Sequence, residues 1–88
     1  MNNNQRYWHI NCPICQQGRV FVEVHEKTGD LFLECEECSS AWNTPDLISE
    51  DKNGFLAIDI ESHFATAEEI QKFGWSRYRF KIAITIDR

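Results

Sequence analysis

The stretch from Cys12 to Cys38, CPICQQGRVFVEVHEKTGDLFLECEEC, decides the fold of this chain. It contains all four cysteines of the sequence, arranged as two Cys-x-x-Cys pairs. Between the pairs, RVFVEVH alternates valines with other side chains, EKTGD has the composition of a turn, and LFLEC resumes the alternation. Strand periodicity on both sides of a turn predicts a β-hairpin, which would bring the two cysteine pairs together.

The cysteine spacing is typical of a site that holds one metal ion with four thiolates. A Cys-x-x-Cys turn sets two sulfurs close together, and a hairpin of about 15–20 residues places a second such turn opposite the first. Four protein ligands leave no coordination position for water, so the ion is expected to be structural. Iron in the same geometry is an open alternative. The predicted ligands of one structural Zn²⁺ are Cys12, Cys15, Cys35 and Cys38.

Disulfides, a thiol-redox site and free buried cysteines are the competing interpretations of the four cysteines. The polar start MNNNQRYWHIN has no apolar signal region, and no apolar run reaches the length of a membrane span. We therefore expect a cytoplasmic protein without a membrane anchor, in which thiols stay reduced. A redox Cys-x-x-Cys motif begins a helix, whereas Gly18 and a valine-rich strand follow Cys15.

The length of 88 residues is enough for one domain. We assign residues 1–6 to a flexible polar tail and residues 7–88 to a single domain. A domain of this size has a marginal hydrophobic core, so a bound metal ion would add needed stability.

The remainder of the chain predicts short helices and further strand structure. Thr44 and Pro45 are suited to start a short helical segment over NTPDLISE, and FLAIDIES is predicted to be a strand. TAEEIQKFGW is predicted to be a helix, because Thr66 and Glu69 form a capping box and Gly74 follows the last turn.

The C-terminal RYRFKIAITIDR alternates apolar and basic side chains, which predicts a half-buried strand. We expect Ile82 and Ile84 in the core and Lys81 in solvent. The predicted fold class is therefore α+β: a small four-cysteine hairpin extended by a C-terminal antiparallel strand, with one or two short helices.

Residues 12–38 resemble the zinc ribbons, in which matching cysteines hold the metal and a hairpin carries the fold. Ribbons often have glycine directly after the second cysteine of each Cys-x-x-Cys turn, or knuckle, whereas this chain has Gln16 and Ser39. A treble clef would start a helix inside the second knuckle. Because the helical signal at Thr44 and Pro45 comes later, we favour a ribbon.

Beyond Cys38 the chain is similar to small bacterial zinc-ribbon proteins. These carry a tryptophan shortly after the last ligand, a proline-initiated turn and a Glu-Glu-Ile helix that ends in Gly-Trp. This resemblance implies an accessory or toxin-neutralising (immunity) role. The matching residues are Trp42, Pro45, Glu68, Glu69, Ile70, Gly74 and Trp75.

Charge favours a basic protein as the partner. The net charge is −5, and residues 23–71 carry thirteen acidic residues against Lys27 and Lys52. Such a surface increases the rate of encounter with a positively charged partner. The most specific form of this hypothesis is that the protein inhibits a basic toxin. The predicted partner-binding residues are Glu34, Glu36, Glu37, Asp46, Glu50 and Asp51.

Nucleic acid is the alternative partner, through the basic residues of the C-terminal strand. Phosphate binding relies on lysine and arginine, and only Arg77, Arg79 and Lys81 form a plausible footprint. The aromatic Tyr78 and Phe80 alternate with these bases and would face the other way, so bases could not stack beside them. We therefore expect nucleic acid to be the less favoured ligand.

Enzymatic activity is not expected. His9, His25 and His63 have no neighbouring pattern of a catalytic triad. Asp59 and Glu61 could form a pair of catalytic carboxylates, but alternating acids are more typical of a solvated strand face.

Overall fold

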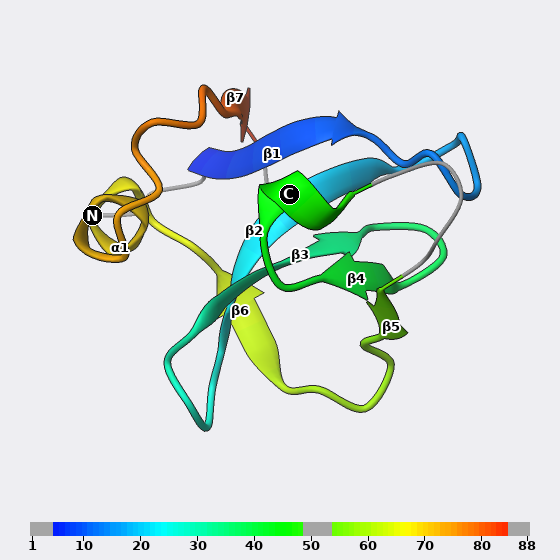
Figure 1. Ribbon diagram of the computed structural model, residues 1–88, viewed down its shortest axis with the longest axis horizontal. Coiled ribbons are helices and arrows are strands. Elements are labelled where there is room, and N and C mark those ends of the chain that lie inside the picture. Colours follow the sequence, from blue (N-terminus) through cyan, green and yellow to red (C-terminus); the bar gives the residue numbers. More distant parts are fainter. Residues whose placement is uncertain (1–4, 49–53, 85–88) are drawn as a thin grey trace.

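The computed structural model describes residues 5–48 and 54–84 (Figure 1). Its elements, in chain order, are β1 (Gln5–Asn11), β2 (Arg19–His25), β3 (Leu31–Cys35), β4 (Ser40–Trp42), the 3₁₀-helix η1 (Pro45–Leu47), β5 (Phe55–Leu56), β6 (Ser62–Phe64), α1 (Ala67–Lys72) and β7 (Lys81–Ile84).

The strands form one antiparallel sheet with the order β5-β4-β3-β2-β1-β7, and β6 also pairs with β2. One edge of β2 is shared, because β1 pairs near its start and β6 pairs with Glu23–His25 at its end. The predicted fold class is confirmed: a cysteine-bearing hairpin is extended through β1 to a C-terminal antiparallel strand, and the described residues include one α-helix and one 3₁₀ turn.

The β2–β3 hairpin forms the centre of the core. Val20 pairs with Cys35 and Val22 with Leu33, so their side chains share one face of the sheet. Val20, Val22 and Leu33 are fully buried. The same apolar cluster includes Trp42, Ala65, Ile70 and Trp75.

A smaller apolar cluster lies on the opposite face. It consists of Phe32, Ala41 and Ala57, with Phe55 and Ile60 packed against it. The chain between β5 and β6 therefore covers part of the outer face of the sheet. Both faces of β3 are buried by this arrangement.

Helix α1 has the predicted ends. The Thr66 hydroxyl accepts from the Glu69 amide, and the Glu69 carboxylate accepts from the Thr66 amide. Gly74 has φ of +86°, the left-handed conformation that glycine adopts most easily after a helix. Ile70 anchors the helix in the main core.

The middle of the chain is more broken than predicted. The helical segment is reduced to Pro45–Leu47, and the Thr44 side chain makes no capping hydrogen bond. Instead of one strand over residues 55–62, Phe55–Leu56 and Ser62–Phe64 are separate strands joined by a turn. They pair with different partners, β4 and β2, which requires a change of direction between them.

The N-terminal segment differs from the predicted tail. Gln5 and Arg6 belong to β1, where they pair with Ile84 and Ala83 of β7. Residues 1–4 lie outside the described part of the chain.

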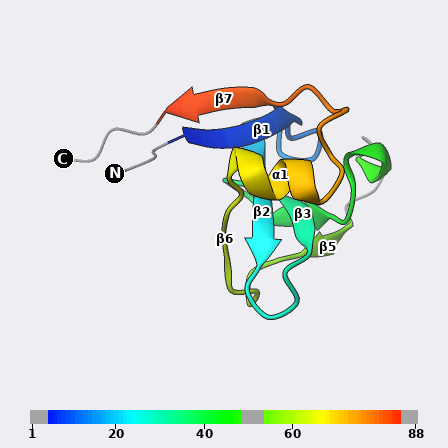
Figure 2. The same ribbon diagram turned by 90° about the vertical axis from the view of Figure 1, so that its left-hand side faces the viewer.

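The prediction that Ile82 lies in the core is wrong, because its side chain is 53% exposed. The regular strand begins only at Lys81, and the aromatic Tyr78 and Phe80 before it make the contacts with the core. Figure 2 shows the end of β7 reaching beyond α1. Lys81 is exposed as predicted, and the prediction for the Ile84 side chain lies outside what the structure describes.

Candidate metal centre

The cysteines meet at one end of the sheet. Cys12 and Cys15 lie in the connection from β1 to β2, Cys35 ends β3, and Cys38 lies in the connection from β3 to β4. These two connections lie side by side, at the right of Figure 1. Antiparallel pairing of β2 with β3 places the end of β3 next to the start of β2, which brings the knuckles together.

The sulfur positions fit one tetrahedral ion. Cys12 Sγ and Cys38 Sγ are 3.8 Å apart, Cys15 Sγ and Cys35 Sγ are 3.6 Å apart, and all four sulfurs lie within 4.8 Å of one another. Zinc–sulfur bonds of about 2.3 Å in a tetrahedron give sulfur separations of about 3.8 Å. The four cysteines are free thiols, and their spacing is much longer than a disulfide bond of about 2.05 Å. They can hold one metal ion, and four thiolates suit Zn²⁺.

The two knuckles have the same backbone geometry. Gln16 and Ser39, which directly follow the second cysteine of each knuckle, have φ of 60° and 63°. Their amides donate to the carbonyls of Cys12 and Cys35, respectively, at 2.9 and 3.2 Å. The expected ribbon turn therefore forms although the usual glycines are missing, at the cost of left-handed backbone in two ordinary residues.

Backbone amides point at the sulfurs. The amide of Ile14 donates to Cys12 Sγ at 3.4 Å, and the amide of Glu37 donates to Cys35 Sγ at 3.3 Å. Hydrogen bonds of this kind stabilise the anionic sulfur that a metal requires. The buried Ser40 hydroxyl lies 3.3 Å from Cys38 Sγ, where it can donate to a thiolate.

The thiol pKa values depend on burial and amide contacts. Hydrogen bonds from the Gln17 and Gly18 amides lower the pKa of Cys15 to about 7. Burial raises the pKa of Cys35 to about 12 and also raises the pKa of Cys12. The two buried sulfurs therefore need a cation beside them to become thiolates at neutral pH.

Gly18 contributes to the centre through its lack of a side chain. A Cβ at this position would lie 2.7 Å from Cys35 Sγ and 2.8 Å from Glu37 Cγ. From the sequence, Gly18 was interpreted only as a residue that suits the turn of the first knuckle. Its position three residues after a ligand was a signal that the backbone passes close to the metal.

Arg19 and Glu36 join the two knuckles. The Glu36 carboxylate accepts from Arg19 Nε at 2.9 Å, from Arg19 Nη2 at 3.3 Å and from the Arg19 amide at 2.9 Å. In return, the Glu36 amide donates to the Arg19 carbonyl at 3.0 Å. Glu36, predicted to bind a partner, is thus paired within the chain, and this ion pair lowers its pKa.

The other predicted partner-binding residues do not form one free acidic face. Burial and the neighbouring Glu23 raise the pKa of Glu34 to about 7, so its charge is reduced at neutral pH. Asp46 lies 3.6 Å from Arg77 and accepts from the Tyr78 hydroxyl at 2.8 Å. Glu37 is exposed and forms no ion pair within the described residues. Glu50 and Asp51 lie outside the described part of the chain.

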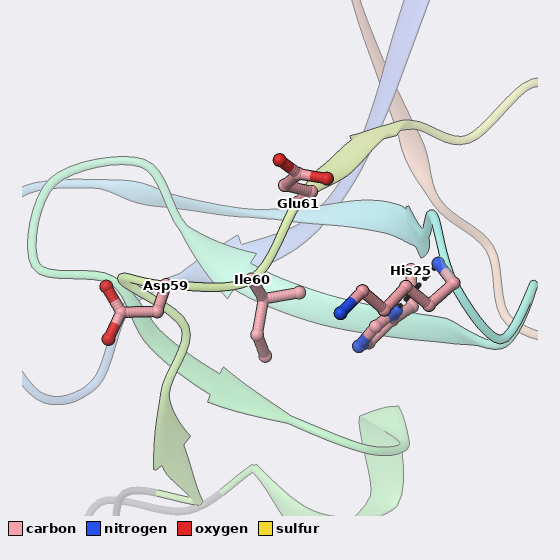
Figure 3. Close-up of a pocket in the computed structure, with 5 residues that line it drawn as sticks. His25, Asp59, Ile60 and Glu61 are labelled. Carbon is pink, nitrogen blue, oxygen red and sulfur yellow. Dashed lines mark hydrogen bonds between the residues drawn. The ribbon is translucent and has the colours of Figure 1, made fainter.

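Asp59 and Glu61 lie at a shallow hollow of about 430 Å³ that His25, Lys27 and Ile60 also line. Figure 3 shows the two carboxylates pointing in different directions and away from His25. The His25 ring accepts a hydrogen bond from the Lys27 amide at 3.1 Å. The arrangement does not bring the two carboxylates together on one reacting atom.

The three histidines occupy separate environments. His9 packs edge-on against Tyr78 and Phe80, and burial lowers its pKa. His63 contacts Glu26 through Nδ1 at 2.7 Å and Glu69 through Nε2 at 3.0 Å. Within residues 5–48 and 54–84, the cysteines are the one group of three or more possible metal ligands that lie close together.

Comparisons with protein-family models, with curated proteins and with solved structures found no match. Within the described residues, no helix is long and apolar enough to cross a membrane. The arrangement of the site, a four-cysteine cluster on a small antiparallel sheet, is consistent with a zinc-ribbon-like domain.

Proposed function

We propose that this chain is a cytoplasmic, zinc-stabilised, non-catalytic domain that binds a basic protein. The observation that carries the proposal is the closed set of four sulfurs at tetrahedral spacing. Four thiolates complete the coordination of one Zn²⁺ and leave no position where it could activate water. The ion therefore stabilises the fold, and the surface of the domain binds the partner.

The charge of the metal end supports a basic partner. Four thiolates around one Zn²⁺ carry a net charge of about −2. Glu37 adds an exposed carboxylate on the second knuckle. Because Glu36 is paired with Arg19, we assign the main role in attracting a basic partner at this end to Glu37. The most specific form of the proposal is that the protein inhibits a basic toxin.

The test is to capture partners with the zinc-loaded chain, purify any basic protein obtained and measure its association rate. We expect Glu37→Lys to slow association several-fold at low salt and to weaken the salt dependence. Glu68→Lys makes the same charge change on α1 and serves as the matched control. Equal rates for the two variants, or capture of no basic protein, would contradict the proposed surface.

A further inference from the structure

The fold joins two segments that the sequence keeps apart. Residues 1–22 contain Arg6 and Arg19 and no acidic residue, and residues 72–88 contain five basic residues and one acidic residue. Strands β1 and β7 come from these segments and pair with each other, as Figure 2 shows. Within the described residues, these two edge strands carry Arg6 and Lys81 and no acidic residue, although the whole chain is acidic, and we call them the basic edge.

Cations and aromatic rings share one face of this edge. Trp8 pairs directly with Phe21 on one side and with Lys81 on the other, and directly paired residues of antiparallel strands point to the same face. Phe64 packs edge-on against Phe21, with ring centroids 5.4 Å apart. We define the cation–aromatic face as Arg6, Arg19, Lys81, Trp8, Phe21 and Phe64.

The cations lie over the rings. Arg6 Cζ is 4.1 Å from the centroid of Phe64, and Lys81 Nζ is 5.0 Å from that of Trp8. Arg19 Cζ is 4.9 Å from the centroid of Phe21. Such contacts hold the charged groups in place beside flat apolar surface.

Two of these cations are available to an anion. Arg19 is already paired with Glu36, whereas Arg6 and Lys81 form no ion pair with any residue in 5–48 or 54–84. Lys81 Nζ donates to the His9 carbonyl at 3.0 Å, which leaves two of its three ammonium protons free.

Trp8 also differs from the other two tryptophans. Trp42 and Trp75 are 1% and 7% exposed and belong to the core, whereas Trp8 is half-buried. From the sequence, Tyr78 and Phe80 were expected to face away from the basic side of the C-terminal strand, which left no ring beside the bases. The structure removes that objection, because the ring beside Lys81 comes from β1.

We propose that the cation–aromatic face binds single-stranded nucleic acid. Phosphates would contact Arg6 and Lys81, and unpaired bases would stack on Trp8 and on the arginine planes held over the phenylalanines. An acidic peptide would satisfy the cations but would make no use of the rings. Glu37 is not part of the cation–aromatic face, although the Arg19–Glu36 pair connects that face to the second knuckle. The two proposals are tested with different variants, so either can fail without the other.

The direct test is titration of labelled oligo(dT) and oligo(U), about 12 nucleotides long, with the zinc-loaded chain at low salt. Because two cations are available for phosphate contacts, the logarithm of affinity should fall with the logarithm of salt concentration with a slope of about −1.4. Binding should also quench the fluorescence of Trp8. The two oligonucleotides distinguish RNA from DNA as the preferred ligand.

Variants separate stacking from charge. Trp8→Leu should weaken binding about 5- to 100-fold, while Trp8→Phe retains most of it. Arg6→Gln and Lys81→Gln should each reduce the magnitude of the salt slope by about 0.7. Arg77→Gln is the matched control, because Arg77 lies beside Asp46, away from this face, and it should change nothing. Zinc content and circular dichroism verify that each variant is folded.

Several results would overturn the proposal. These are no measurable binding of either oligonucleotide, unchanged affinity in folded Trp8→Leu, or the same loss in Arg77→Gln as in Arg6→Gln. Equal competition by polyglutamate would show that charge alone acts and that an acidic protein is the better ligand. Equal affinity for duplex DNA would exclude stacking of unpaired bases.

Discussion

Strand β1 adjoins two regions of opposite character, the metal centre after its last residue and the edge strand β7 along its side. At the metal end, Cys12 and Cys35 are each 1% exposed. The two knuckles there are stabilised by backbone hydrogen bonds, by amide–sulfur hydrogen bonds and by the Arg19–Glu36 ion pair. At the basic edge, β7 pairs on one side within the described sheet, and Ile82 is 53% exposed. The difference teaches that this small domain concentrates its buried and hydrogen-bonded residues around the four sulfurs, whereas one side of β7 is unpaired within the described sheet.

Removing the metal should have the largest effect. Binding of Zn²⁺ to four cysteines contributes on the order of 10 kcal/mol, which is comparable to or exceeds the whole stability of a small domain. A strong chelator or Cys35→Ser should therefore abolish the near-ultraviolet circular dichroism of the buried tryptophans. Added Zn²⁺ should restore the chelated protein but not the variant. A native spectrum without metal would show that the core is sufficient on its own.

Truncating one side chain in each region should sharpen the contrast. Leu33 is fully buried, so Leu33→Ala should lower the free energy of unfolding by about 2–5 kcal/mol. Ile82→Ala should lower it by less than about 1 kcal/mol, because the side chain is more than half exposed. Urea denaturation of the zinc-loaded proteins measures both. Equal losses would mean that Ile82 is covered in solution, for example by a second molecule.

Two glycines provide the next comparison. Gly18→Ala should destabilise the domain by about 1–3 kcal/mol and lower zinc affinity about 10- to 100-fold, since the new methyl group collides with Cys35 Sγ. Gly29→Ala in the β2–β3 turn meets no atom within 4 Å and only strains a φ of +78°. It should cost about 1 kcal/mol and leave zinc affinity unchanged. Competition with a chromogenic chelator reports the affinities.

The smallest predicted effect concerns pH. Hydrogen bonds to Glu69 and Glu26 raise the pKa of His63 in the folded chain. Its contribution to stability is therefore full below the unfolded pKa of about 6.5 and is lost as pH rises through the folded value. The stability difference between the wild type and His63→Gln should stay below about 1 kcal/mol, and should be larger at about pH 6 than at about pH 8.5. A difference that grows with pH would contradict this sign.

The sequence predicted the parts of the molecule that local pattern determines. Cysteine spacing, valine alternation and the Thr66–Glu69 capping box each depend on residues close in the chain, and the structure confirms the cysteine cluster, the hairpin and α1. The side chains of Gln16 and Ser39 did not indicate their left-handed backbone, because this conformation is usually adopted by glycine.

The errors arose where distant segments decide the structure. Strand β1 was missed because its central residues are all half-buried, so it shows no alternation of exposed and buried positions. Its aromatic and β-branched composition in RYWHI was the available signal. Ile82 was misplaced because alternation identifies the two faces of a strand but not how far the core extends beneath it. Glu36 and Asp46 were predicted to be free to bind a partner, but each forms an ion pair with an arginine distant in the sequence. Such pairs cannot be identified from the residues next to each carboxylate.

The pairing of β1 with β7 has a consequence for the order of folding. The contacts of the β2–β3 hairpin, such as Val24 with Leu31, join residues within one short loop, whereas Trp8 and Lys81 lie at opposite ends of the described chain. Closing the longer loop costs about 2 kcal/mol more in chain entropy. During synthesis the hairpin and both knuckles emerge before β7 exists. We therefore expect the metal end to form first, and β1 to pair with β7 only after β7 has been synthesised.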